Sequence, residues 1–192
     1  MTPVTSMSRR QAMAFPLLAG LSTAGAGSVA HAADSNVLVA YFTRTANTRL
    51  VATQIARALD ATLFQIVPVE PYPEDYKAQV AQAEDERVRG YEPPLRETVP
   101  NLQSYETIFL GFPIWGMTAP AVIRSFLSRH DLAGKTLVPF ISHGGYGIGS
   151  SLTVVTEHAP GARLLEGFSK QCDQERETLE QVTEWLARVG IN

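Results

Sequence analysis

Cysteine is nearly absent from this chain of 192 residues, because Cys172 is the only one. A single thiol rules out an intramolecular disulfide, a cysteine-based metal cluster and a paired-thiol redox site. Redox chemistry in this protein would therefore depend on a bound cofactor.

Other signatures of catalysis and binding are missing too. Neither Ser142 nor Ser150 lies in a Gly-x-Ser-x-Gly elbow, which disfavours a serine hydrolase. His130, His143 and His158 do not stand at metal-ligand spacings with Cys or Glu, so we predict no metal site. The formal net charge of −3 also disfavours nucleic acid as a partner.

Long hydrophobic runs are confined to the N-terminal region. Ser8–Gln11 carries two arginines, and a weakly apolar stretch without acidic residues, Ala12–Val29, follows it. This pattern predicts a twin-arginine export signal over residues 1–32, cleaved after the small-x-small triplet that ends at Ala32. An uncleaved membrane anchor is the alternative, which Pro16 and the many small residues disfavour. We therefore expect a periplasmic protein without stable membrane insertion, whose mature domain spans residues 33–192.

The mature chain alternates short apolar runs with helical patterns. Val37–Phe42 is apolar throughout, and Val51, Ile55, Ala58 and Leu59 then recur at helical spacing. Further strands are expected at 62–69, 107–112, 136–142 and 163–168, and further helices at about 74–89, from Pro120, from Leu152 and from about Asp173. This alternation predicts an α/β fold with a doubly wound parallel sheet.

The turn between the first strand and the first helix is rich in hydroxyl groups. Its sequence is TRTANT, over Thr43–Thr48. The first N–H groups of a helix have no partners within the helix, and the helix dipole favours an anion there. The turn therefore suits a phosphate. Because Asn and Thr are also good N-cap residues, an ordinary helix cap is the alternative.

The pattern Thr-x-Thr-x-Asn-Thr after a first strand resembles the FMN-phosphate loop of flavodoxins. Glu106–Met117 (ETIFLGFPIWGM) and Phe140–Gly149 (FISHGGYGIG) stand where flavodoxins carry their second and third flavin loops. The resemblance extends from Asn36 to the C-terminus. It implies a five-stranded flavodoxin-like sheet with strand order 2-1-3-4-5, and FMN as the cofactor. Ligands of such sheets bind beyond the carboxyl ends of the strands, so the three loops should converge.

The resemblance places the FMN-binding residues in these three loops. They are Thr43, Arg44, Thr45, Ala46, Asn47 and Thr48 in the first, Pro113, Ile114, Trp115 and Gly116 in the second, and Ser142, His143, Gly144, Gly145 and Tyr146 in the third.

Individual roles follow for some of these residues. Trp115 suits stacking on the flavin, although a hydrophobic plug over the sheet is the alternative. Tyr146 is the candidate for a second flavin-facing aromatic. The resemblance implies that the Gly116 peptide can turn its carbonyl toward the flavin and so tune the one-electron steps. His143 is either a proton source or a surface residue of the loop.

The second and third loops contain no carboxylate between residues 113 and 118 or between 142 and 149. Flavodoxins that transfer electrons usually keep acidic groups near the flavin, which lower its potential. Their absence here predicts a milder potential. Glu84, Asp85 and Glu86 are interpreted as the solvated face of a charged helix, and Trp185 as a packing residue. Tyr72 and Tyr76 resemble a pattern found in one subgroup of flavodoxin-like proteins.

The functional prediction is an exported FMN-binding protein that transfers electrons in the periplasm. Its partners would be redox proteins or a quinone-like small molecule. An FMN-dependent NAD(P)H:quinone-type oxidoreductase is the alternative within the same chemistry. A binding module that has lost the flavin is the alternative of another class, because a fold does not fix a function.

Overall fold

The computed structural model describes residues 36–171 and 175–191, and side chains of the last helix from Glu180 onward. The predicted export signal, its cleavage position and Cys172 lie outside the described residues. Within the described part, no helix combines the length and the apolarity that a bilayer crossing requires.

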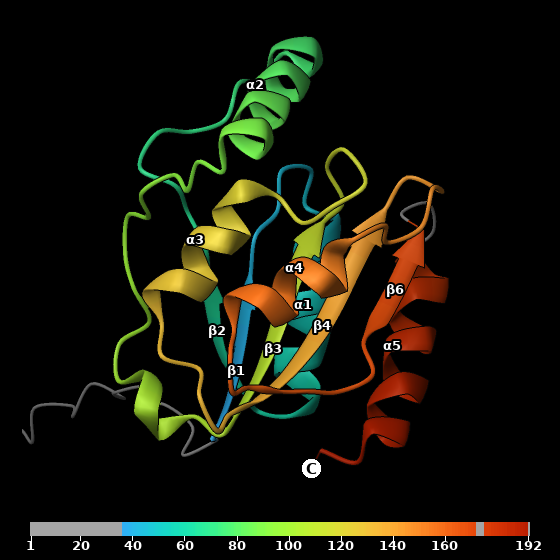
Figure 1. Cartoon of the computed structure of the whole chain (residues 1–192). Helices are drawn as coiled ribbons and strands as arrows, with labels where there is room; N and C mark the ends of the chain where they lie inside the picture. Colours follow the sequence, from blue (N-terminus) through green and yellow to red (C-terminus); the bar gives the residue numbers. More distant parts are fainter. Residues whose placement is uncertain (1–35, 172–174, 192) are drawn as a thin grey trace, which may run out of the picture. The chain divides into compact units, whose positions relative to one another are not determined.

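Strands and helices alternate along the chain (Figure 1). In order they are β1 (Val37–Tyr41), α1 (Asn47–Ala58), β2 (Thr62–Gln65), α2 (Tyr76–Arg89), the short 3-10 helix η1 (Leu102–Ser104), β3 (Thr107–Pro113), α3 (Ala121–Arg129), β4 (Thr136–His143), α4 (Ser151–His158), β5 (Arg163–Leu164), β6 (Phe168–Gln171) and α5 (Glu175–Val189).

The strands form one parallel sheet in the order β2-β1-β3-β4-β5, and β6 also pairs with β4. Central strands are buried on both faces, and every residue of β1 is buried. A parallel sheet covered on both sides requires such continuous apolar runs. The doubly wound α/β fold with strand order 2-1-3-4-5 is therefore confirmed.

The fifth strand differs from its prediction as a single element, because it is divided into β5 and β6. Leu137 pairs with Leu164 and Phe140 pairs with Phe168. Two residues of β4, 138 and 139, therefore lie opposite the three residues 165–167 that join β5 to β6. Pro139 stands at this interruption. Proline has no N–H to donate to a ladder, so the neighbouring strand loses its pairing there and resumes at β6.

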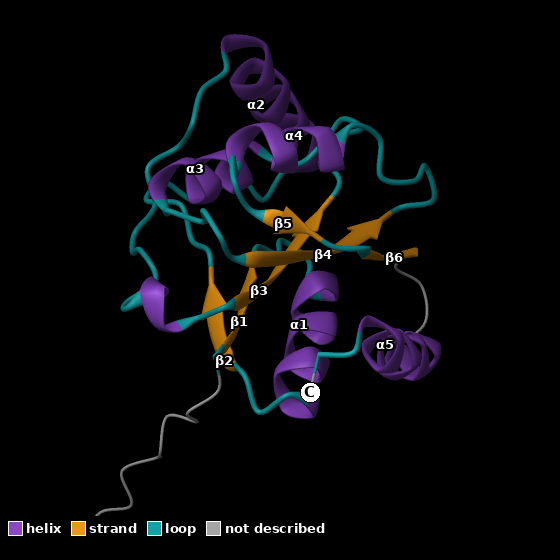
Figure 2. Cartoon of the chain, turned by 60° about the horizontal axis from the view of Figure 1, so that its bottom comes forward, coloured by secondary structure: helices purple, strands orange, loops and turns teal. Residues whose placement is uncertain are grey.

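Helices cover both faces of the sheet (Figure 2). On one face α3 and α4 pack over apolar side chains that include Leu38, Ile108 and Leu110. On the other face α1 and α5 pack over a set that includes Val39 and Phe109. The prediction that Trp185 is a packing residue is confirmed, because it is 2% exposed and its ring lies edge-on at 5.6 Å from that of Phe109.

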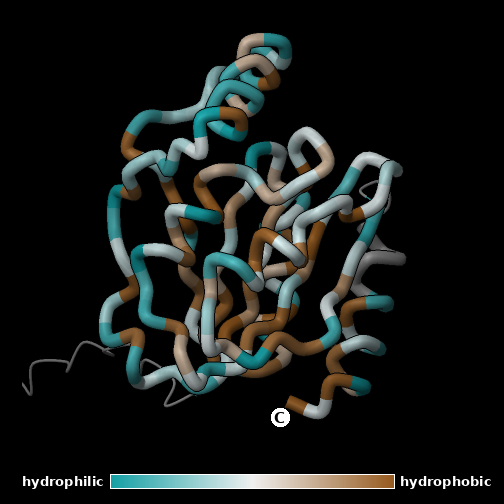
Figure 3. Tube along the Cα trace, in the orientation of Figure 1, coloured by the Kyte–Doolittle hydropathy of each residue, from teal (hydrophilic) through white to brown (hydrophobic). Residues whose placement is uncertain are grey.

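Helix α2 lies beyond the carboxyl ends of the strands (Figure 1). Its N-cap is Asp75, whose carboxylate accepts a hydrogen bond from the N–H of Ala78 at 2.8 Å. Figure 3 shows it as a mixture of hydrophilic and hydrophobic positions. The interpretation of residues 84–86 as a solvated face is wrong for Glu86, which is only 2% exposed.

Candidate functional site

The loops after β1, β3 and β4 meet at the carboxyl edge of the sheet because these three strands are neighbours. The N–H of Ile114 donates to the carbonyl of Ser142 at 3.0 Å, and the N–H of Ser150 donates to the carbonyl of Met117 at 3.0 Å. These bonds join the second loop to the third. The topology thus brings the three predicted segments together.

The first loop leads into a helix that no side chain caps. The N-cap residue of α1 is Ala46, which has a positive φ of 68° and makes no side-chain hydrogen bond to the helix. The first helical bond runs from the N–H of Leu50 to the carbonyl of Ala46, at 3.0 Å. Thr45 and Asn47 are exposed beside this turn. The helix-cap interpretation of the hydroxyl groups is therefore wrong, and the first-turn N–H groups remain available to an anion.

Two of the predicted site residues have interior side chains. Thr48 and Ser142 are 1% and 5% exposed, and their hydroxyl oxygens lie 2.9 Å apart. This hydrogen bond connects the start of α1 to the end of β4. It fixes the first loop relative to the third.

The second loop makes a tight turn at Gly116 and Met117, which have φ values of 56° and 63°. Positive φ is the region that glycine adopts without a steric cost. Trp115 and Thr118 exchange backbone hydrogen bonds of 3.0 and 3.2 Å across the turn. The Gly116 carbonyl accepts a hydrogen bond from Nη1 of Arg87 on α2, also at 3.0 Å. The turn is therefore held partly by α2.

Trp115 rests on two other aromatic rings. Its ring lies 5.3 Å from Phe42 and 4.7 Å from Tyr72, in both cases nearly perpendicular. Edge-to-face contacts of this kind are favourable and fix the orientation of a ring. Trp115 is neither fully buried nor free to rotate.

Behind Trp115 lies a polar contact that sequence reasoning missed. The Tyr72 hydroxyl donates to Oε2 of Glu86 at 2.8 Å, and Nε2 of Gln82 donates to Oε1 of the same carboxylate at 2.9 Å. Burial raises the pKa of Tyr72 strongly, and the Glu86 charge and hydrogen bond raise it further. Tyr72 is therefore a neutral donor that holds its ring against Trp115.

Residues 144–146 of the third loop are exposed to solvent. Tyr146 is 85% exposed, and Gly144 and Gly145 are exposed beside it. Nδ1 of His143 accepts a hydrogen bond from the N–H of Gly145 at 3.1 Å, which orients the half-buried ring. The role of His143 and the flavin contact of Tyr146 stay predictions.

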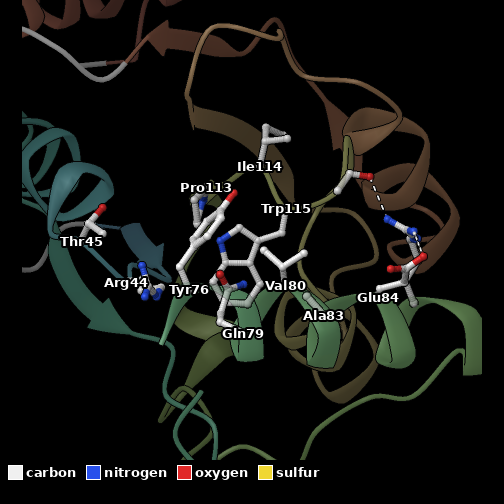
Figure 4. A pocket seen from close by; sticks show the side chains of 12 residues that line it. Arg44, Thr45, Tyr76, Gln79, Val80, Ala83, Glu84, Pro113, Ile114 and Trp115 are labelled. Atoms are coloured by element: carbon white, nitrogen blue, oxygen red, sulfur yellow. Dashed lines mark hydrogen bonds and ion pairs between the residues drawn. The ribbon is translucent and has the colours of Figure 1, made fainter. Parts of the chain in front are cut away.

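A cavity of about 330 Å³ lies between α2 and the first two loops (Figure 4). Its lining includes Arg44 and Thr45 of the first loop, Pro113–Gly116 of the second, and Tyr76, Gln79, Val80, Ala83, Glu84 and Arg87 of α2. The α2 residues were missed from the sequence, although Tyr76, Val80 and Ala83 stand at helical spacing. A second cavity of about 490 Å³, lined by Thr43 and Tyr72 among others, adjoins the first loop on its other side.

Cationic groups lie close to the loops. Nη2 of Arg44 donates to the carbonyl of Glu74 at 2.6 Å, and Arg87 contacts Gly116. Glu84 is the one carboxylate in the lining of the first cavity, 3.7 Å from Arg87. The local charge is therefore net positive.

The flavodoxin family matches residues 36–189 of the chain. No curated protein matches it.

Several solved structures are similar to the chain. A candidate flavoprotein from Bacteroides eggerthii is 31% identical, with a TM-score of 0.71 over 81% of this chain and 98% of that one. One from Bacteroides uniformis is 29% identical, with a TM-score of 0.68 over 77% and 97% of the two chains. A flavoprotein from Lactobacillus acidophilus in complex with FMN is 18% identical, with a TM-score of 0.63 over 75% and 97%, and shows the fold alone.

Proposed function

This chain belongs to the flavodoxin family, and from that premise we propose that it binds FMN and transfers electrons in the periplasm as an exported flavoprotein. The observation that carries FMN binding is the uncapped start of α1 within a hydroxyl-rich loop, next to Trp115. These groups match the two ends of FMN, a phosphate and a large flat ring.

The donors of the first loop fit a phosphate. Backbone N–H groups in the first turn of α1 have no helical partners, and Thr45 and Asn47 are exposed beside them. Such groups bind an anion through hydrogen bonds and the helix dipole. Because Ala46 is the N-cap residue, no side chain competes for these N–H groups.

The second loop fits an aromatic ring. Trp115 is held by Phe42 and Tyr72, so its indole can receive a flat ligand without losing much conformational freedom. When bound, FMN supplies the redox chemistry, and the chain supplies binding, orientation and the local electric field. The excess of arginine over carboxylate beside the second loop stabilises negative charge, which supports a milder potential.

The export signal predicted at residues 1–32 supports the periplasm as the location. Twin-arginine signals commonly imply export of folded proteins, and FMN must be inserted where it is made, in the cytoplasm. A cofactor loaded before export would require such a route.

The test is the visible spectrum of the protein purified after export with its own signal. We expect a yellow protein with the absorbance bands of flavin. After FMN removal, the apoprotein should bind FMN at least about 10-fold more tightly than riboflavin, because a charge-assisted phosphate site contributes more than about 1.4 kcal/mol. A colourless protein that does not bind added FMN would contradict the proposal and favour a module that has lost the flavin.

An FMN-dependent oxidoreductase is the second candidate, favoured by the cavity of about 330 Å³ beside Trp115. An electron carrier needs no such cavity, since it docks proteins at an exposed flavin edge. The two candidates separate when NAD(P)H oxidation by the FMN-loaded protein is followed with a quinone acceptor. Steady turnover indicates the oxidoreductase, and reduction only by a partner protein indicates the carrier.

A further inference from the structure

The cavity between α2 and the second loop shares Arg44, Thr45 and Pro113–Gly116 with the predicted FMN site, but it extends beyond that site along α2. Gly144–Tyr146, in the third loop, do not line it, whereas α2 residues from Tyr76 to Arg87 do. We propose that this cavity binds a second molecule next to the flavin, and that this molecule is a planar aromatic compound carrying an anionic group. The proposal rests on FMN binding at the three loops.

The walls of the cavity provide the aromatic part of the site. Tyr76 and Val80 are 68% and 43% exposed, although both side chains are largely apolar, and both line the cavity together with Trp115 (Figure 4). Exposed apolar side chains that gather around one concave space lose contact with water when a flat ligand enters. These two rings and an aliphatic side chain suit an aromatic ligand.

Gln79 provides a polar group in the lining. It is only 3% exposed, and its side-chain amide can donate a hydrogen bond to a ligand oxygen in the cavity.

The charged residues of the cavity determine which sign of charge a ligand should carry. Arg44 donates to a neutral backbone carbonyl, and Arg87 donates to another. The single acid in the lining, Glu84, lies 3.7 Å from Arg87 and is 66% exposed in its side chain. Two guanidinium groups thus face one solvated carboxylate, so an anion is favoured over a cation.

The experiment measures binding of naphthalene-2-sulfonate to the FMN-loaded protein by calorimetry, with uncharged 2-naphthol for comparison. Val80→Trp fills the cavity. Val88→Trp is the matched control, because Val88 is on the same helix, 76% exposed and outside the lining. We expect Val80→Trp to weaken sulfonate binding at least about 10-fold and Val88→Trp to change it less than about 2-fold. Both variants should keep FMN.

A second pair of variants tests the charge. Arg87→Met removes a cation from the lining, and Arg89→Met removes one that pairs with Asp85 outside it. Arg87→Met should weaken sulfonate binding about 3- to 10-fold with little effect on 2-naphthol, because the guanidinium attracts the anionic sulfonate and not the uncharged naphthol. Arg89→Met should change neither affinity.

Three outcomes would overturn the proposal. The first is no probe binding by the wild-type holoprotein at millimolar concentration. The second is equal binding by Val80→Trp and the wild type. The third is loss of FMN from Val80→Trp, or displacement of FMN by the probe, which would make the cavity part of the cofactor site. In the third case FMN binding itself stands, whereas a wild-type protein unable to bind FMN would contradict the proposed function instead.

Discussion

At the scale of single residues, Glu86 shows how a helix separates neighbours in sequence. Successive residues of a helix point in directions about 100° apart, so three consecutive acids cannot share one environment. Glu84 and Asp85 have side chains 66% and 57% exposed, whereas Glu86 turns inward to Tyr72 and Gln82. The buried carboxylate acts on Trp115 only through the Tyr72 ring, as a positioning residue.

His130 is a second buried polar residue, and its hydrogen bonds define its protonation. Nε2 accepts from the N–H of Val99 at 3.0 Å, so Nδ1 carries the proton and donates to the Phe126 carbonyl at 2.6 Å. Burial lowers the pKa of His130, the Phe126 bond opposes this, and the Arg129 charge lowers it further. The folded protein therefore holds a neutral imidazole.

From this we predict a loss of stability in weak acid. Below the unfolded-state pKa of about 6.5, the unfolded chain binds a proton that the folded chain does not, so the free energy of unfolding falls as pH falls. The decrease due to His130 approaches about 1.4 kcal/mol per pH unit until the lowered folded pKa is reached. Urea unfolding at pH 7.5 and 5.5 should show a smaller decrease in the free energy of unfolding for His130→Gln than for the wild type. Equal decreases in the two proteins would contradict the prediction.

At the scale of elements, the division of the fifth strand into β5 and β6 depends on the close approach of Gly167 to Pro139 of β4. A Cβ added at Gly167 would lie 2.7 Å from both Cγ and the carbonyl oxygen of Pro139. Only glycine allows the chain to pass the ring and the backbone so closely. Pro139 interrupts the ladder and Gly167 accommodates the interruption.

Gly167→Ala should therefore destabilise the protein. The added methyl group meets backbone as well as a ring, so an overpacking cost of about 1–3 kcal/mol is expected. Gly144→Ala is the control, because nothing lies within 4 Å of the Cβ it adds. Chemical denaturation of both variants measures the difference. Equal stability of the two variants would show that the strand tolerates the methyl group.

At the scale of the whole molecule, the hydrogen bond between Thr48 and Ser142 joins residues 94 positions apart. It connects α1, which presents the first loop, to β4, which presents the third. Because both side chains are buried, loss of either hydroxyl leaves the other without a partner in a nearly dry environment.

A double-mutant cycle tests this connection. Thr48→Val and Ser142→Ala should each lower the free energy of unfolding by about 1–3 kcal/mol. The double variant should lose less than the sum, with a coupling of about 0.5–3 kcal/mol. Additive losses would mean that the two hydroxyls do not depend on each other.

Much of this architecture was predictable because its signals are local. Apolar runs such as 107–112 are typical of strands buried on both faces, and α1 follows from a repeat at helical spacing. The three predicted site loops follow from the resemblance to flavodoxins, and each of them comes after a strand that the pattern marked. The division at Pro139 also has a sequence signal, because a proline in a central strand indicates an interruption of the hydrogen-bond ladder.

The sequence by itself determined the alternation of strands and helices, the lack of paired thiols and the three loops that we predict to carry the site. Only the tertiary structure decided that α2 reaches Trp115 and Gly116, that Glu86 is buried and that Thr48 faces Ser142. The physical reason is range: periodicity reports contacts within a few residues, whereas these contacts join segments between 14 and 94 positions apart. Such contacts depend on how complete elements pack, which no local pattern encodes.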